Sequence, residues 1–174
     1  MKDARPPFVG AGFDDPRFIL LYSHWNNIRP PGSVPSRRAI DPIEIFRLLP
    51  IIWLCDYCES KDTFRFRLAG EEICAPYQRN IKGMTLDQMF DGDRFVYANT
   101  QLKKTALDPC INLVSGFKVW NVDRYNDGMR LILPLLTDGI PGIVAITIAI
   151  PSVTPEETDF DETMLTAHAF PIPA

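Results

Sequence analysis

Strand patterns separated by turn residues fill the last third of the chain, and they restrict its fold more than any other feature. Residues 111–122, 129–136 and 143–150 each have the composition of a β-strand. Residues 125–128 and 138–142 lie between them and are rich in Asn, Asp and Gly, which tolerate the positive φ angles of tight turns. This region therefore predicts three antiparallel strands joined by hairpins.

Two further strands are predicted at residues 51–58 and 64–68, with a turn at 59–62. Successive side chains of a strand point to opposite faces of the sheet. In the second strand, one face therefore carries the apolar side chains Phe64, Phe66 and Leu68. The opposite face carries the basic side chains Arg65 and Arg67.

Helix signals occupy much of the remaining chain. We expect helices at residues 15–29 and 41–50, short broken turns at 71–90 and a longer helix at 93–106. The first begins with Asp15 as a capping side chain and Pro16 at the first helical position. The second begins with Asp41 and Glu44, which are spaced as a capping box.

The order of these elements predicts the α+β class. A five-stranded antiparallel sheet would carry the inserted helices on one face and the N-terminal helices on the other. Residues 1–50 would form an arm and two capping helices, and residues 51–150 the core of the domain. Residues 151–174 would form a tail that can start a short helix at 154–157 and ends loosely from His168.

Composition excludes several classes of protein. Eighteen basic and 22 acidic residues give a net charge of -4, so we expect no nucleic-acid partner. The longest apolar run, residues 143–150, is far shorter than the roughly 20 residues of a membrane helix. The N-terminus lacks the pattern of a secretory signal, so we expect a cytoplasmic protein without a membrane partner.

Short motifs in a fixed order resemble the stand-alone PAS-domain proteins that are common in proteobacteria. That family has an N-terminal helix ending in Trp, a "PsR…dP" segment, a strand reading "f.yRl.G", a Gly after the helical insert and a late "LPL…dG". The matching residues, over roughly 15–150, are Trp25, Pro35-Ser36-Arg37, Asp41-Pro42, Leu49-Pro50, the run from Phe64 to Gly70, Gly83, Thr85, Leu133-Pro134-Leu135 and Asp138-Gly139. One departure is Glu71, where many members carry a small hydroxyl residue.

The resemblance implies a PAS-like fold and a non-enzymatic, cytoplasmic sensory or interaction module that is often dimeric. The curved sheet of such a fold faces short helices and can leave a cavity for a small molecule. We therefore expect an unknown small-molecule ligand, a protein interaction, or both. We also expect a homodimer and a separate signalling partner.

The candidate ligand cavity combines side chains of the sheet with side chains of the inserted helices. Its predicted lining is Phe66, Leu68, Ile73, Tyr77, Phe95, Leu102, Leu133 and Ile146. Arg65 and Arg67 are candidate anion contacts. The alternative, which we favour, is that these two arginines form ion pairs with Asp41, Asp56 or Glu44.

Cysteine and histidine chemistry has weaker support in the sequence. Cys55 and Cys58 have the CxxC spacing, but they fall on a predicted strand, where positions three apart face opposite sides. No second paired spacing completes a metal site, and the helix at 93–106 has no histidine for haem. The surroundings of Cys74 do not resemble a flavin photosensor motif. We predict no cofactor, metal or catalytic residue, and keep a thiol redox or metal protein, or a cavity-bearing α+β enzyme, as alternatives.

Overall fold

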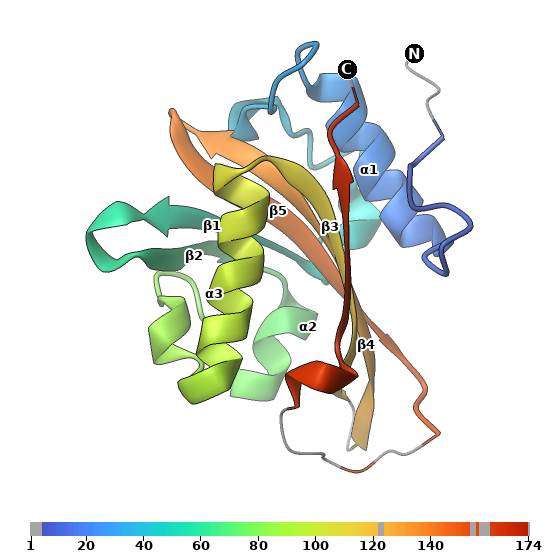
Figure 1. The fold of residues 1–174 in the computed structure, drawn as a ribbon, viewed down its shortest axis with the longest axis vertical. Helices are drawn as coiled ribbons and strands as arrows, with labels where there is room; N and C mark the ends of the chain where they lie inside the picture. Colours follow the sequence, from blue (N-terminus) through green and yellow to red (C-terminus); the bar gives the residue numbers. More distant parts are fainter. Residues whose placement is uncertain (1–4, 122–123, 154–155, 157–160, 174) are drawn as a thin grey trace.

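A curved antiparallel sheet with helical segments on both faces makes up the fold (Figure 1). The computed structural model describes residues 5–121, 124–153, 156 and 161–173. The six strands run in the order β2-β1-β5-β4-β3-β6, and all adjacent strands are antiparallel. They are β1 (Ile52–Cys58), β2 (Thr63–Ala69), β3 (Cys110–Asn121), β4 (Arg124–Thr137), β5 (Ile140–Ile150) and β6 (Thr166–Pro171). The α-helices are α1 (Pro16–Ile28), α2 (Glu71–Cys74) and α3 (Gly92–Leu107).

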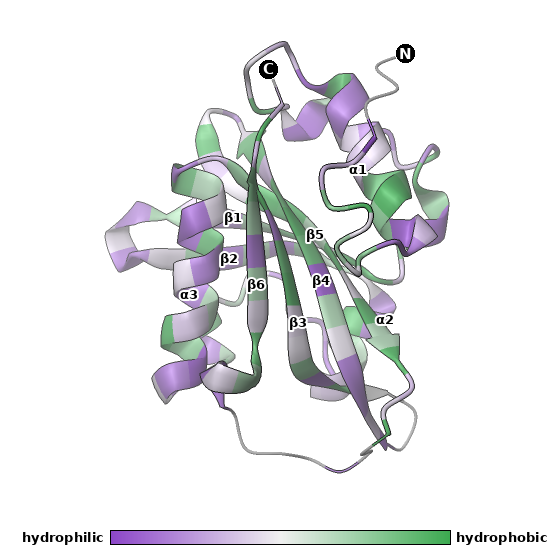
Figure 2. Ribbon diagram, turned by 45° about the vertical axis from the view of Figure 1, so that its right-hand side comes forward, coloured by the Kyte–Doolittle hydropathy of each residue, from purple (hydrophilic) through white to green (hydrophobic). Residues whose placement is uncertain are grey.

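The outer face of the sheet is covered by α1 and its neighbouring segments, which lie apart from α3 across the sheet (Figures 1 and 2). The α1 side chains Phe18, Leu21 and Trp25 are all buried there. The Trp25 indole Nε1–H donates to the carbonyl oxygen of Pro134 in β4 at 2.8 Å, which ties the helix to the sheet. Asp15 caps the helix as predicted, because its carboxylate accepts from the N–H of Arg17 at 2.8 Å.

The inner face is covered by α2, α3 and the 3-10 turns η4 (Ala75–Tyr77) and η5 (Leu86–Gln88). The turn η6 (Glu162–Met164) contacts α3 and leads into β6. Side chains of the two faces alternate along each strand, so that Trp53 belongs to the inner cluster and Ile52 and Leu54 to the outer cluster. No helix among the described residues is long and apolar enough to cross a membrane.

The predicted second N-terminal helix is wrong. Residues 41–50 form turns with one 3-10 turn, η2 (Phe46–Leu48). The Asp41 N–H donates to Nε2 of buried His24 at 3.2 Å, and the opposite ring nitrogen of His24 donates to the Glu44 carboxylate at 2.8 Å. The Asp41 N–H and the Glu44 carboxylate are therefore bound by α1 instead of by each other, while the Asp41 carboxylate accepts from the Ile43 N–H at 2.8 Å.

Two further predictions about the last third are corrected. Residues 125–128 lie inside β4 and are not a hairpin turn, because β3 and β4 pair from Asn121 and Arg124 onward. The predicted loose tail supplies β6, a sixth strand beside β3, which covers backbone groups that an edge strand would expose. The predicted helix at 154–157 falls largely outside the described residues. The second predicted turn is confirmed, since Asp138 and Gly139 have φ angles of 50° and 85° between β4 and β5.

Candidate functional site

A cavity of about 1070 Å³ lies between the inner face of the sheet and the helical segments. This volume lies just above the usual range of sites that hold small organic molecules, about 300–1,000 Å³. Its apolar lining comes from both layers: Ile73, Ile81, Leu86 and Leu102 from the helical side, and Val114 and Ile132 from the sheet. Met164 and Leu165 line the end near η6.

Arg130 of β4 lies in the sheet wall of this cavity. No described carboxylate forms an ion pair with it. Its Nε–H donates to the Thr147 hydroxyl at 3.0 Å, and the Trp53 indole N–H donates to the same oxygen at 3.1 Å. The guanidinium carbon lies 5.1 Å from the ring centroid of Trp53 and 4.6 Å from that of Phe117. Two aromatic faces and one hydroxyl thus hold the guanidinium in place.

The position of Phe117 depends on Gly128, its partner in the β3–β4 ladder. A Cβ atom at Gly128 would lie only 2.2 Å from Cε2 of Phe117. The aromatic ring therefore covers the glycine closely, and glycine is required here by this close approach. A bulge between Ser115 and Phe117, with Gly116 at a φ of 90°, places Phe117 in this register.

Two tyrosines lie near Arg130 in the cavity wall. Burial raises the pKa of Tyr77, and the positive charges of Arg130 and Arg94 partly oppose that rise. Burial also raises the pKa of Tyr97, again opposed by Arg130. For Arg130, burial lowers the pKa, yet a guanidinium stays protonated at neutral pH. The cavity therefore presents one half-buried positive charge beside two neutral phenols.

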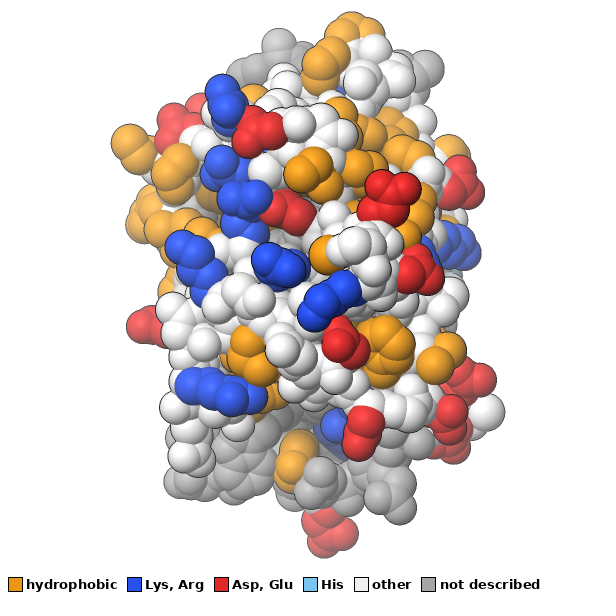
Figure 3. Space-filling view, turned by 90° about the vertical axis from the view of Figure 1, so that its left-hand side faces the viewer, with side chains coloured by type: hydrophobic (Ala, Val, Ile, Leu, Met, Phe, Trp, Pro, Cys, Tyr) orange, Lys and Arg blue, Asp and Glu red, His pale blue; other side chains and the backbone are white. Residues whose placement is uncertain are grey.

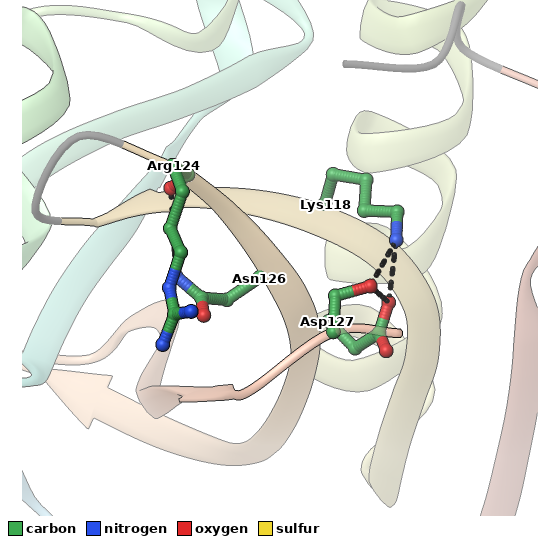
Figure 4. Close-up of polar contacts among 5 residues, drawn as sticks. Lys118, Arg124, Asn126 and Asp127 are labelled. Carbon is green, nitrogen blue, oxygen red and sulfur yellow. Dashed lines mark hydrogen bonds and ion pairs between the residues drawn. The ribbon is translucent and has the colours of Figure 1, made fainter. Parts of the chain in front are cut away.

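A second polar group of the cavity is already neutralised within the chain. Lys118 of β3 donates to the Asp127 carboxylate at 2.7 Å and to the Ser152 hydroxyl at 2.6 Å, as Figure 4 shows. Arg124 and Asn126 lie on the other side of β4 in the same view (Figure 4). Lys118 and Asp127 therefore form an internal pair at one end of the cavity, unlike Arg130.

The structure brings together half of the predicted cavity residues. Phe66, Ile73, Tyr77 and Leu102 line the cavity. Phe95 packs against the inner cluster from α3 without lining the cavity. Whether any of these side chains contacts a ligand stays a prediction.

Three predicted lining residues are wrong. Leu133 and Ile146 point to the outer face and pack beneath α1, in the cluster that contains Trp25. Their neighbours Ile132 and Thr147 line the cavity instead. Leu68 is 42% exposed, because a bulge pairs Leu54 with Leu68 but Cys55 with Phe66, and this extra residue in β2 reverses which face Leu68 occupies.

Arg65 and Arg67 do not line the cavity. The Nε of Arg67 lies 2.5 Å from the Asp56 carboxylate, which is one of the ion pairs that the sequence predicted as the alternative to anion binding. Arg65 is exposed on β2. The face of the molecule on the β1–β2 side carries basic and acidic side chains interspersed (Figure 3), so its arginines do not form a separate cationic site.

Arg130, Trp53 and Thr147 are cavity residues that were not predicted from the sequence. A usable signal was present in β5, where one alternating set is bulky and the other contains Ala145 and Thr147. Small side chains leave room for a cavity, whereas the bulky set fills the space beneath α1.

The cysteines occupy separate environments. Cys55 is buried in the inner cluster, and burial raises its pKa well above the usual value. The sulfur of Cys58 contacts the Ser60 hydroxyl at 3.5 Å, and this hydrogen bond lowers its pKa. All four cysteines are free thiols, and the described residues contain no cluster of His, Cys, Asp and Glu side chains suited to a metal ion.

Comparison with known protein families identifies the family of this chain. A PAS domain family model matches residues 14–141, which include α1, the first four strands, α2, α3 and the first residues of β5. The chain therefore belongs to the PAS domain family. No significant match was found among curated proteins or among solved structures.

Proposed function

We propose that this chain is a non-enzymatic, cytoplasmic PAS sensory module that binds a small molecule between its sheet and α3 and passes the signal to a separate protein. One observation carries the proposal: the cavity of about 1070 Å³ combines an apolar lining with the half-buried cation Arg130. A few placed polar groups in a mostly apolar pocket are typical of small-molecule sites.

The cavity lining suggests how occupancy could change the surface. Tyr97 and Leu102 of α3 line the cavity, as do Met164 and Leu165 at the start of the segment that leads into β6. A ligand that contacts both segments would favour the conformations that fit it. We infer that the exposed surfaces of α3 and β6 report occupancy to the partner.

Thermal denaturation with a small-molecule library tests ligand binding. A ligand at 100 times its Kd adds about 2.7 kcal/mol to stability, which raises the Tm of a domain of this size by about 5–10 °C. A neutral solvatochromic naphthalene dye reports access to the cavity by its fluorescence. We expect the dye to bind the natural chain and some library members to raise its Tm.

Two variants of α3 show whether binding occurs in the cavity. Ala98 lines the cavity, so Ala98→Phe should fill it and abolish both signals. Val96 is 60% exposed on the same helix, so Val96→Phe should preserve them. If the dye and every library member fail to bind the natural chain, the module is an adaptor with a closed core and the sensory proposal is wrong.

Homodimer formation is a further proposal. The outer sheet face and the α1 stripe, which suggested a dimer in the sequence, cover each other within one chain. Support now comes from the exposed side chains Ile43, Phe46 and Leu49, which are 79%, 59% and 42% exposed and lie together in one short segment. Analytical ultracentrifugation of the natural chain and of Phe46→Ser would test it, with a monomeric natural chain as the contradicting result.

A further inference from the structure

The chemical class of the ligand can be inferred from Arg130, on the condition that the cavity is a ligand site as proposed above. The guanidinium uses Nε for the Thr147 hydroxyl and lies over the rings of Trp53 and Phe117. No described residue accepts a hydrogen bond from its two terminal nitrogens or supplies a carboxylate partner. The remaining donors form the planar fork at the end of the side chain.

The acidic side chains of the cavity do not satisfy this fork. Asp127 is paired with Lys118 at 2.7 Å. Glu72 and Asp161 are exposed residues at the rim. The groups whose charges act on Arg130 are Tyr77, Tyr97 and Cys55, and none of them is a carboxylate. Arg130 is half-buried, and a cation that has lost part of its water without gaining a counter-ion is costly, so a bound anion would reduce that cost.

We propose that the ligand is an amphipathic monocarboxylate whose head group binds the terminal nitrogens of Arg130 and the Tyr77 hydroxyl. A carboxylate matches the guanidinium fork with two parallel hydrogen bonds. It also brings one negative charge to one unpaired positive charge. The apolar body of the acid lies against Ile73, Ile81, Leu86, Leu102, Val114 and Ile132, which line the cavity from both layers.

Matched pairs of acids and amides test this assignment. Octanoate and octanamide, and 1-naphthylacetate and 1-naphthylacetamide, differ in charge at nearly constant shape. Isothermal titration calorimetry against the natural chain measures each Kd, and displacement of the neutral naphthalene dye measures the same competition. We expect at least one acid to bind at least about tenfold more tightly than its amide, as charge-assisted hydrogen bonds are stronger than neutral ones.

Variants locate the preference at Arg130. Arg130→Met should reduce the acid-to-amide ratio to about one while the dye still binds, and Arg130→Lys should keep part of the ratio because it keeps the charge but not the fork. Arg65→Gln removes a positive charge from the exposed surface of β2 and should leave the ratio unchanged. Without ligand, the Tm of Arg130→Met should equal or exceed that of the natural chain, since the variant removes an uncompensated, half-buried charge.

Each other outcome overturns a specific part of the proposal. Equal binding of acid and amide, or dye binding that no acid competes with, would rule out carboxylate recognition and leave the sensory proposal standing. Preference for octyl phosphate over octanoate would assign a phosphate monoester instead. A large fall in the Tm of Arg130→Met would make Arg130 a structural residue. If the neutral dye also fails to bind, the sensory proposal itself fails.

Discussion

Phe117 covers Gly128 so closely that a Cβ atom at the glycine would lie 2.2 Å from Cε2 of the ring. The same ring lies 4.6 Å from the guanidinium carbon of Arg130. A glycine on β4 therefore allows the position of an aromatic ring on β3, which in turn supports the half-buried cation. The Gly128 backbone, the Phe117 ring and the Arg130 guanidinium therefore pack together in the wall of the cavity.

Gly128→Ala should displace Phe117 and lower the free energy of unfolding by about 1–3 kcal/mol, as overpacking does in a close-packed site. Urea denaturation measures this change. In a Phe117→Ala background the same substitution should cost less, because the ring is gone and only Cγ2 of Val119, 2.7 Å from the added Cβ, still collides. An equal cost in both backgrounds would show that the contact does not explain the glycine.

The two faces of β5 should respond differently to small changes. Ile146→Val removes one methyl group beneath α1 and should lower the free energy of unfolding by about 0.5–1.5 kcal/mol, with the affinity for the neutral dye unchanged. Thr147→Val leaves the Trp53 and Arg130 donors without their shared acceptor and should weaken binding of the carboxylate probes. Fluorescence titration of both variants measures their affinities for the dye and for the carboxylate probes. An effect of Ile146→Val on dye affinity would contradict the assigned faces.

Trp25→Phe should lower the free energy of unfolding by about 1–3 kcal/mol, because the buried carbonyl of Pro134 loses its donor. Tyr22→Phe is a matched control on the same helix. The Tyr22 hydroxyl is buried without a hydrogen-bond partner among the described residues, so its removal should be neutral or slightly stabilising. Chemical denaturation of both variants provides the test, and a larger loss for Tyr22→Phe would contradict it.

Thiol reactivity should follow the environments of the cysteines. Iodoacetamide should modify Cys58 first, because its hydrogen bond to Ser60 lowers the pKa of the thiol. Cys55 should react only after unfolding, because burial raises its pKa and hides its sulfur. Peptide mass spectrometry over time measures both. Ready formation of a Cys55–Cys58 disulfide under mild oxidation would revive the thiol redox alternative.

Asp15 should contribute a pH-dependent part of the stability. The hydrogen bond from the Arg17 side chain lowers the pKa of Asp15 from its usual 3.8 in the folded state. A lowered folded pKa adds stability above the unfolded pKa, and this stability is lost as pH falls through the folded pKa. Asp15→Asn keeps the cap and removes the charge, so it should cost up to about 1 kcal/mol near pH 7.

Denaturation curves of the natural chain and Asp15→Asn between pH 2 and pH 7 check this dependence. The difference between the two proteins should shrink below the unfolded pKa of about 3.8. A constant difference across that range would show that the charge of Asp15 adds nothing to folding.

Local patterns predicted the elements whose signals lie within one segment. The cap at Asp15, the β1–β2 hairpin and the turn at Asp138 and Gly139 all depend on neighbouring residues, and the structure contains each of them. The predicted helix at 41–50 failed where the Asp41 N–H and the Glu44 carboxylate, which a capping box would join, each bind His24, 17 and 20 residues away. No local rule can rank a distant partner against a nearby one.

The cavity shows the same difference between local signals and long-range packing. Alternation along β5 established two distinct faces but not which face turns toward α1, so Ile146 was assigned to the cavity in place of Thr147. A one-residue bulge in β2 moved Leu68 out of the cavity.

The amino-acid sequence by itself determined the α+β class and the PAS-like order of elements, because hydrophobic period, caps and turns act over a few residues. Only the tertiary structure decided that Trp53, Phe117, Arg130 and Thr147 meet, because those four residues come from four different strands. Their contacts depend on the strand order, on the bulges and on which face of the sheet each side chain occupies. The packing of both layers sets all three at once.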